Sequence, residues 1–422
     1  MRVRPSYKEG MDEALISTKK DVLLVAPFTN LPGEKGFNRF SYIANKLSEI
    51  GHNVTLVTSS FKHREKKFRD QKAISERSFP YNLVIIPELG YTKNVGFDRI
   101  WSHRHFAKQL TAYLNVIEIK PDVIYCAYPM MGAAYEVGKF AKRNKIPFIL
   151  DIQDVWPESI KNTLKFPDPL TDTLLYPLTM YANRIYKLAD SVVGVSQSYI
   201  ARVEKVNDHA KNFLPVYIGT DLNHFDSCKA LKVMKKQNEF WITYVGTFSY
   251  SYDIPTVIRA VAKLKKKGFD HIVFKVMGDG PFRAKYEELA TELDAPVDFM
   301  GHLSYEQMIP TLVRSDVAAN AISKGAQQSI TNKIGDYVAA GLPILNSSQN
   351  KEFCDIVTSR KLGYNYAPGD ANTLADLIES LYNDSDLRRA FGANSRKLAE
   401  EKFDRRTSYQ EIYSVVEGVS IR

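Results

Sequence analysis

Cysteine is scarce in this sequence, and its few copies are widely separated. The 422 residues contain only Cys126, Cys228 and Cys354, and no CxxC pair or zinc-ligand spacing occurs. Disulfide-rich secreted domains and structural zinc sites both need closely grouped cysteines. We therefore predict a protein of a reducing compartment that holds no structural zinc.

Other absences narrow the class further. No uninterrupted apolar run reaches the roughly 20 residues that a membrane-spanning helix needs. Residues 1–20 are too polar for a signal peptide, so we treat them as a leader and expect a cytoplasmic protein. A GxGxxG fingerprint is also missing, which argues against a dinucleotide cofactor, and no nucleic-acid-binding module is recognisable.

The composition that remains is that of a globular protein with more than one domain. Hydrophobic residues make up 44% of the chain and charged residues 25%, and 422 residues exceed what one core usually supports. The net charge of +9 is gathered in runs, one of them at residues 62–69. Solvated helix faces explain most such runs. The alternative here is attraction to an anionic membrane surface, aided by the aromatic residues of 101–106.

Strands and helices alternate from residue 21 to residue 220, which predicts a Rossmann-like first domain. Residues 22–26 and 52–58 read as buried strands around a helix at 40–50. The loop from Gly33 to Gly36 then lies at the carboxyl end of the first strand, where open α/β sheets bind ligands. Asp151 and Asp154 follow a later strand directly.

A polar segment, 221–239, reads as a linker to a second α/β domain at 240–403. Glycine loops follow two of its predicted strands, at Gly246 and Gly278. Residues 404–422 are predicted to form a C-terminal helix that returns to the first domain. Two successive domains of this kind imply a ligand cleft between them.

Residues 331–347 are the most informative stretch, because they place a cation where a helix disfavours one. Thr331 is a candidate N-cap, and Gly341 with Pro343 ends the helix before a short strand. Lys333 lies in the first turn, where free N–H groups attract anions. A bound phosphate would explain the lysine, with Asp336 on the same face accepting hydrogen bonds from ribose. The alternative is an ordinary surface pair between these two side chains.

Six segments occur in order: Ile218-Gly-Thr-Asp221, Tyr244-Val-Gly-Thr247, Gly278-Asp-Gly-Pro281, Phe299-Met-Gly-His-Leu-Ser304, Ser315-Asp316 and Asn332-Lys-Ile-Gly-Asp-Tyr-Val-Ala-Ala-Gly-Leu-Pro343. The last five together resemble the donor domain of the GT-B glycosyltransferases of family 4, and the first resembles the family's segment before the linker. Asp151-Ile-Gln-Asp-Val-Trp-Pro-Glu-Ser159 resembles a subset of this family that builds bacterial surface polysaccharides. The resemblance spans roughly residues 20–418.

The resemblance implies a retaining, metal-independent transfer from a nucleotide diphosphate sugar to a glycan or lipid-linked acceptor, with no cofactor. Lys333 would contact the diphosphate, and Asp336 would replace the glutamate that binds ribose. Residues expected on the donor side are Gly246, Thr247, Gly278, Arg283, Met300, His302, Gln328, Lys333 and Asp336. On the acceptor side we expect Gly33, Gly36, Gln153, Asp151 and Asp154, of which Asp154 is the preferred carboxylate facing the incoming hydroxyl.

The sequence also departs from the family pattern. Gln328 stands where a glutamate is common, Thr247 where an arginine is common, and Gln153 where many members have histidine. Lys333 is then the main cation for the diphosphate, with Arg283 as a second. These losses leave two alternatives open: a catalytically silent partner subunit, and a sugar-nucleotide epimerase of the same fold.

Two further patterns carry less weight. Asp384-Ser-Asp386 matches the DxD of metal-dependent glycosyltransferases, but its polar surroundings before a helix favour capping. His103 and His105 share a predicted helix with Trp101 and Phe106 and have no evident third ligand. We expect packing or membrane contact there, and no metal site.

Overall fold

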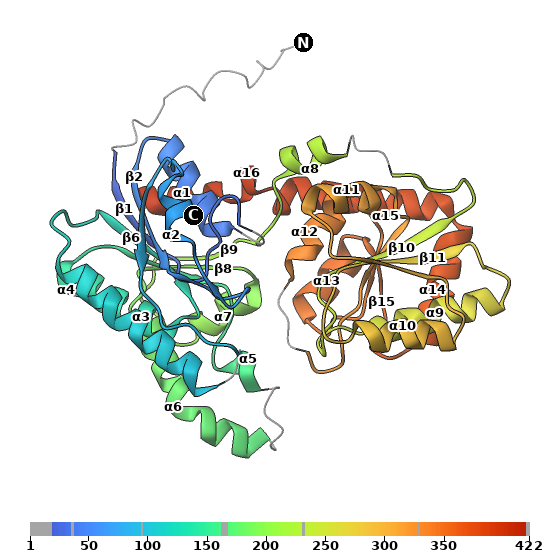
Figure 1. Cartoon of the computed structure of the whole chain (residues 1–422), viewed down its shortest axis with the longest axis horizontal. Helices are drawn as coiled ribbons and strands as arrows, with labels where there is room; N and C mark the ends of the chain where they lie inside the picture. Colours follow the sequence, from blue (N-terminus) through green and yellow to red (C-terminus); the bar gives the residue numbers. More distant parts are fainter. Residues whose placement is uncertain are drawn as a thin grey trace, which may run out of the picture. The chain divides into compact units, whose positions relative to one another are not determined.

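A computed structural model describes residues 19–34, 38–93, 96–161, 168–229, 233–326 and 330–418. It confirms the α/β class, since the chain builds two parallel sheets with helices packed against them (Figure 1). Packing divides the chain into two compact units. The first contains the described residues up to Leu150, with Leu188–Ser191 and the segment from Tyr413 onwards; the second contains Asp151–Lys187 and Val192–Ile412. The boundaries predicted near residues 220 and 240 remain predictions.

The first sheet has seven strands in the order β5-β2-β1-β6-β7-β8-β9. Strand β1 pairs with β2 and with β6, and β2 pairs with β5, in each case in parallel. The strands are β1 (Asp21–Val25), β2 (Asn53–Ser59), β5 (Asn82–Ile86), β6 (Val123–Tyr128), β7 (Phe148–Ile152), β8 (Ser191–Gly194) and β9 (Asn212–Pro215). Every residue of β6 and β7 is buried, as expected of strands covered on both faces.

Helices follow these strands in turn. The predicted helix at 40–50 and the predicted helix that carries His103 appear as α1 and α3, and α3 packs against α4. The helices of this part are α1 (Arg39–Glu49), α2 (Gln71–Ser75), α3 (Phe97–Asn115), α4 (Met131–Asn144), α5 (Glu158–Lys161), α6 (Asp168–Tyr186) and α7 (Gln197–Glu204). Two short strands, β3 (Phe61–Lys62) and β4 (Lys67–Phe68), form a hairpin outside the sheet.

The second sheet has six parallel strands in the order β12-β11-β10-β13-β14-β15. The chain moves outward from β10 to β12 and then returns to the other side of β10 with β13. This reversal makes the carboxyl ends of β10 and β13 a topological switch point, the place where such sheets bind ligands. The strands are β10 (Phe240–Val245), β11 (Ile272–Met277), β12 (Val297–Gly301), β13 (Val317–Asn320), β14 (Ile344–Asn346) and β15 (Gly363–Asn365).

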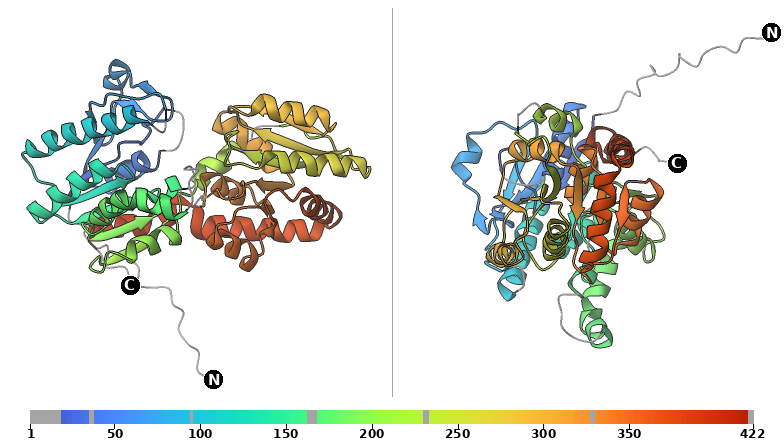
Figure 2. Two further views of the ribbon diagram at one scale, coloured as in Figure 1. Left: turned by 90° about the horizontal axis from the view of Figure 1, so that it is seen from below. Right: turned by 90° about the vertical axis from the view of Figure 1, so that its right-hand side faces the viewer.

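Alternation along β10 explains how this sheet is covered. Phe240, Ile242 and Tyr244 belong to one core with helices α9 and α14, and the core on the opposite face contains α11 and α12. Figure 2 shows helices on both faces of this sheet. The helices are α8 (Leu222–Cys228), α9 (Ile254–Lys266), α10 (Arg283–Glu292), α11 (Tyr305–Arg314), α12 (Asn332–Ala339), α13 (Lys351–Ser359), α14 (Ala371–Asn383) and α15 (Ser385–Leu398).

The segment predicted as a polar linker is helical at its start. Asp221 accepts a hydrogen bond from the backbone N–H of His224 and so caps α8. Leu222, Phe225 and Cys228 lie on one face of this short helix and are buried. The apolar spacing is too short to stand out in the sequence, and the packing of α8 against α11 and α12 stabilises it.

The C-terminal segment is helical as predicted. A π-helical turn (Ala399–Phe403) leads into α16 (Arg405–Ser408) and α17 (Gln410–Glu417). In the first unit, the Lys20 ammonium donates to the backbone carbonyls of Val416 and Glu417, at 3.2 and 2.9 Å. These bonds satisfy carbonyls that a helix C-terminus leaves free. Across the described residues, no helix is both long and apolar enough to cross a membrane.

Candidate functional site

Glycine loops line the carboxyl edge of the second sheet, where β10 and β11 end. Gly246 has φ +145° and Gly278 has φ +151°, conformations that side chains rarely adopt. A Cβ atom on Gly278 would lie 1.8 Å from the carbonyl oxygen of Gly246, and one on Gly280 would lie 2.4 Å from that of Phe248. The two loops therefore touch backbone to backbone, and only glycine fits their contact.

Helix α12 begins at this edge, and no side chain of the described residues caps it. Thr331 occupies the N-cap position as predicted, but its hydroxyl makes no capping bond, and its buried Oγ1 has no partner among the described residues. Amide N–H groups of the first turn have no side-chain acceptor in the described part of the chain, and they carry the positive end of the helix dipole. The start of α12 is thus suited to an anion.

Lys333 lies in this first turn and is buried, with 7% of its surface exposed. Within the part of the chain that is described, its ammonium has no hydrogen-bond partner. The nitrogen instead lies 4.3 Å from the ring centre of Tyr244 and 3.8 Å from that of Tyr252. Burial lowers the pKa of Lys333 well below its usual range. The surface-pair alternative fails for this residue, because the lysine is buried and is not paired with Asp336.

Asp336 is turned toward another part of the chain. Its Oδ1 accepts hydrogen bonds from the hydroxyls of Thr220, at 2.6 Å, and Tyr305, at 2.9 Å. Burial raises the pKa of this carboxyl, and the two hydroxyls oppose the rise. Asp336 thereby ties α12 to α11 and to the residues before α8. A role in binding ribose stays a prediction.

The other predicted donor-side residues are spread around the same edge. Arg283 begins α10, where its guanidinium donates to Glu287 at 2.8 Å and lies 3.5 Å from Asp279. Arg283 is the second cation that we predicted for the diphosphate, and these two carboxylates already neutralise much of its charge. Thr247 is exposed and its carbonyl oxygen accepts from Tyr244 Oη at 3.0 Å. Met300 and His302 flank Gly301 at the end of β12. Gln328 lies outside the described residues.

The predicted acceptor-side carboxylates follow β7. Asp151 is fully buried, and its Oδ1 accepts from the Gln153 amide. Asp154 is bound more fully: its two oxygens accept hydrogen bonds from the Trp156 indole at 3.0 Å, the Tyr199 hydroxyl at 3.2 Å and the Ser159 hydroxyl. These donors hold the carboxylate in a fixed orientation.

In the first unit, one expectation about charge is wrong in part. Arg69 ends the basic run at 62–69, yet it is 6% exposed and pairs with Glu34. Its guanidinium also donates to the carbonyls of Ser59 and Thr29, at 2.8 and 2.6 Å, and so joins the loops after β1 and β2. Arg69 stabilises the loop of Gly33, which has φ +82°, and cannot meet a membrane. Gly36 lies outside the described residues.

The aromatic helix α3 presents both of the expected environments. Phe106 is fully buried in the core, whereas Trp101 is 62% exposed. His103 packs against Phe28 and Tyr91, at ring distances of 5.5 and 5.6 Å. His103 therefore belongs to an internal aromatic cluster.

The DxD pattern serves as a helix cap. Asp384 accepts a hydrogen bond from the backbone N–H of Leu387 at 2.8 Å and begins α15, and Asp386 pairs with Arg389. Among the described residues, no group of three or more histidine, cysteine, aspartate or glutamate side chains has metal-binding geometry.

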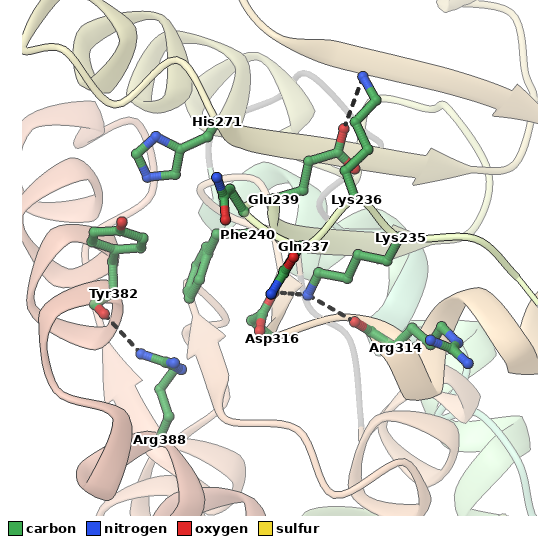
Figure 3. A pocket seen from close by; sticks show the side chains of 11 residues that line it. Lys235, Lys236, Gln237, Glu239, Phe240, His271, Arg314, Asp316, Tyr382 and Arg388 are labelled. Atoms are coloured by element: carbon green, nitrogen blue, oxygen red, sulfur yellow. Dashed lines mark hydrogen bonds and ion pairs between the residues drawn. The ribbon is translucent and has the colours of Figure 1, made fainter.

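A hollow of about 670 Å³ lies at the opposite, amino-terminal edge of the second sheet. Figure 3 shows Lys235 bonded to Asp316 and to the carbonyl of Arg314, while Lys236 pairs with Glu239. The two lysines that line this hollow are therefore already neutralised by carboxylates. Parallel sheets bind ligands at the other edge, so this hollow is not the donor site.

Three residues of the candidate site were missed from the sequence. Tyr252 was not singled out in the loop after β10, Tyr305 carries no pattern, and Thr220 was noted only as part of the segment Ile218–Asp221. Because these side chains meet α12 from other elements, only the folded chain shows their contacts.

Comparison with known proteins agrees with the geometry. Residues 38–224 match the family described as Glycosyltransferase Family 4, and residues 230–398 match Glycosyl transferases group 1. An uncharacterized glycosyltransferase of Methanocaldococcus jannaschii is 24% identical over 241 residues, which cover 55% of this chain and 59% of that protein. The chain thus matches less than two thirds of this relative's length.

Solved structures share the fold over nearly the whole chain. Sucrose-phosphate synthase of Thermosynechococcus elongatus superposes with a TM-score of 0.71 at 17% identity, covering 95% of this chain and 99% of that one. HepE of Anabaena in complex with UDP gives 0.66 at 15% identity, covering 95% and 100%. The chain belongs to the glycosyltransferases, with a Glycosyltransferase Family 4 region followed by a group 1 region on a GT-B fold.

Proposed function

We propose that this protein transfers a sugar from a nucleoside diphosphate sugar to a glycan or lipid-linked acceptor in the synthesis of a surface polysaccharide, with retention of the anomeric configuration. The observation that carries the donor assignment is the buried Lys333 ammonium, which has no hydrogen-bonding partner among the described residues and lies at a helix start that no described side chain caps. Structures of HepE hold UDP and UDP-glucose on the same fold, which supports this class of donor.

The donor diphosphate would lie at the carboxyl edge of the second sheet. The first-turn N–H groups of α12 and the Lys333 ammonium would bind its oxygens, and the glycine loop at Gly246 lets backbone approach them. These groups are oriented before the ligand arrives. They therefore stabilise the charge that grows on the departing diphosphate with little reorganisation.

In the proposed transfer, the acceptor hydroxyl oxygen forms a bond to the anomeric carbon on the face that the diphosphate leaves. The bond between that carbon and the phosphate oxygen breaks, and the hydroxyl proton passes to the leaving phosphate oxygen. Asp154 would orient the hydroxyl, because three hydrogen-bond donors hold its carboxylate in place; Asp151 is the alternative. We propose that no divalent metal or other cofactor takes part.

The test has two stages. Thermal unfolding is first measured with a panel of nucleotide sugars, since a bound donor raises the apparent stability by mass action. Product formed from an α-linked donor is then analysed by NMR, with EDTA and without it. We expect an α-linked product in both. A β-linked product contradicts retention, and activity lost in EDTA and restored by manganese contradicts metal independence. Binding without any turnover or hydrolysis would favour a silent partner subunit, and inversion at a sugar carbon of the free donor would favour an epimerase.

We also propose that the protein works in the cytoplasm, at the inner face of the cell membrane. Exposed apolar side chains at the start of α3 support this proposal, namely Phe97, Ile100 and Trp101.

A further inference from the structure

Two tyrosine rings surround the Lys333 ammonium. The nitrogen lies 4.3 Å from the centre of the Tyr244 ring and 3.8 Å from that of Tyr252, well inside the roughly 6 Å range of cation–π attraction. The rings are 5.8 Å apart and inclined at 68°, so the ammonium meets two separate ring faces. Gly246 adds no side chain here: a Cβ atom on it would lie 3.3 Å from the lysine nitrogen.

This surrounding attracts the charge without neutralising it. A carboxylate partner would accept the N–H donors of the ammonium and cancel its charge, but no described residue supplies one to Lys333. Ring faces carry a partial negative charge and no net charge. The ammonium thus has no counter-charge among the described residues, and it lies beside a helix start that no described side chain caps.

Both rings are held by the fold. Tyr244 is fully buried on β10, and its hydroxyl donates to the Thr247 carbonyl at 3.0 Å. Tyr252 packs on the same core, and its backbone N–H donates to the Ser249 carbonyl at 3.1 Å. The next residue is bonded as well, from Asp253 N–H to the Ala321 carbonyl at 3.2 Å. The loop after β10 therefore fixes the ring of Tyr252 over the lysine.

We infer that Tyr244 and Tyr252 form an aromatic cage that positions Lys333 and keeps it charged for a phosphate oxygen of the donor. This inference rests on the proposed function, and it makes Tyr252 a positioning residue, because its ring acts on the donor through Lys333. The loop after β10 contains no cation of its own, and it contributes to the donor site through the ring face of Tyr252.

The cage predicts a particular pH dependence. Donor binding needs the protonated lysine, so affinity falls as pH rises through the pKa of Lys333. Loss of the Tyr252 ring removes attraction for the charged form and leaves the burial unchanged. The decline in affinity then begins at a lower pH in Tyr252→Leu than in the wild type.

Two measurements test the inference on the full chain. The first uses protein labelled with 13C at the lysine ε-carbon, in which the Lys333 signal is identified by its loss in Lys333→Arg. We expect an upfield ring-current shift and a low titration midpoint in the wild type. In Tyr252→Leu the shift should shrink and the midpoint should fall, whereas Tyr252→Phe, which keeps the ring face, should match the wild type.

The second measurement is calorimetric binding of UDP, GDP and TDP between pH 6 and pH 9. For the nucleotide that binds, Tyr252→Leu should weaken affinity about 3- to 30-fold at pH 8, the factor expected for a buried cation–π contact. Tyr252→Phe should restore it. Tyr250→Leu is the matched control, because Tyr250 lies in the same loop and is 85% exposed.

The outcomes separate the two proposals. An unchanged Lys333 signal in Tyr252→Leu overturns the cage, whatever the nucleotide affinities. A changed signal with unchanged nucleotide affinity and pH profile overturns the positioning role. If Tyr252→Leu changes the Lys333 signal but the wild type binds none of the three nucleotides, the proposed function is overturned and the cage stands.

Discussion

Lys333 is buried, and no described residue gives it a carboxylate partner, so its contributions to stability and to binding have opposite signs. Charging this side chain in the folded protein costs free energy that the unfolded chain does not lose. We expect Lys333→Met, which keeps the length of the side chain, to raise the melting temperature at pH 7. The same variant should weaken donor binding by about 1.5–3 kcal/mol through loss of a charge-assisted hydrogen bond.

The pH dependence of that melting temperature follows from the direction of the pKa shift. Burial holds the pKa of Lys333 below its value of 10.5 in the unfolded chain. The destabilisation is fully present below the folded-state pKa and disappears as pH rises toward 10.5. The difference between variant and wild type should therefore shrink at alkaline pH in a thermal-shift series. Lys351→Met is the control, because its side chain is 88% exposed. A lower melting temperature in Lys333→Met, with unaltered donor affinity, would contradict both assignments.

Gly278 tests the contact between the two glycine loops. An alanine there must adopt φ +151° and would also press its methyl group against the Gly246 carbonyl. The strained backbone costs about 1–3 kcal/mol, and overpacking adds about 1–3 kcal/mol. Chemical denaturation of Gly278→Ala should show the sum. Gly268→Ala isolates the strain, since Gly268 has φ +95° and no atom within 4 Å of an added Cβ. Equal losses in the two variants would count against the loop contact.

At the scale of secondary-structure elements, α3 and the loop after β2 share a buried aromatic cluster. His63 and His103 both pack against Phe28, and burial lowers the pKa of each to about 3, with Lys66 and Arg99 adding to the effect. The unfolded chain takes up these protons near pH 6.5, so stability falls as pH drops below 6.5. Each histidine should cost about 1.4 kcal/mol per pH unit.

Hydrogen exchange of peptides from β2 and α3 between pH 7 and pH 5, corrected for intrinsic rates, measures this loss. We expect His103→Phe to remove about half of it, since phenylalanine fills the aromatic site and binds no proton. Glu88 also faces this cluster, and burial raises its pKa. Because both the wild type and His103→Phe contain Glu88, it does not contribute to the difference between them. His302→Gln, at an exposed histidine, should follow the wild type. If His103→Phe loses as much stability as the wild type between pH 7 and pH 5, His103 is not held neutral in the folded chain.

For the molecule as a whole, net charge and exposed apolar surface together predict reversible membrane binding. The chain carries +9, and its first unit exposes Phe97 by 81% and Trp101 by 62%. We expect co-sedimentation with anionic vesicles that weakens as salt is raised. Changing both residues to serine should reduce binding at least tenfold, because each buried aromatic contributes about 1.5–3 kcal/mol.

Met234→Ser serves as the control for this experiment, because Met234 is 95% exposed and lies in the second unit. Equal binding to neutral and anionic vesicles would refute the electrostatic part. Unchanged binding by the Phe97 and Trp101 double variant would refute the choice of surface.

The features that sequence alone predicted correctly are local ones. The alternating strands and helices, the glycine loops at Gly246 and Gly278 and the helix that begins beside Lys333 each depend on residues within one short segment. Turn chemistry and the spacing of apolar residues act over that range, so they can be recognised before folding. Resemblance added the glycosyltransferase class by joining several such segments in order.

Only the tertiary structure decided what surrounds each of these residues. Arg69 looked like part of a solvated basic run and is a buried clamp, because β4 brings it beside Glu34. Asp336 was expected beside Lys333, yet it contacts Thr220 and Tyr305, which are 116 and 31 residues away. The ring of Tyr252 reaches Lys333 from 81 positions earlier in the chain. The sequence by itself determined the elements and the lysine at the start of α12, since both depend on near neighbours. The partners of that lysine depend on β10 and β13 being adjacent in the sheet, a pairing that exists only once the chain has folded.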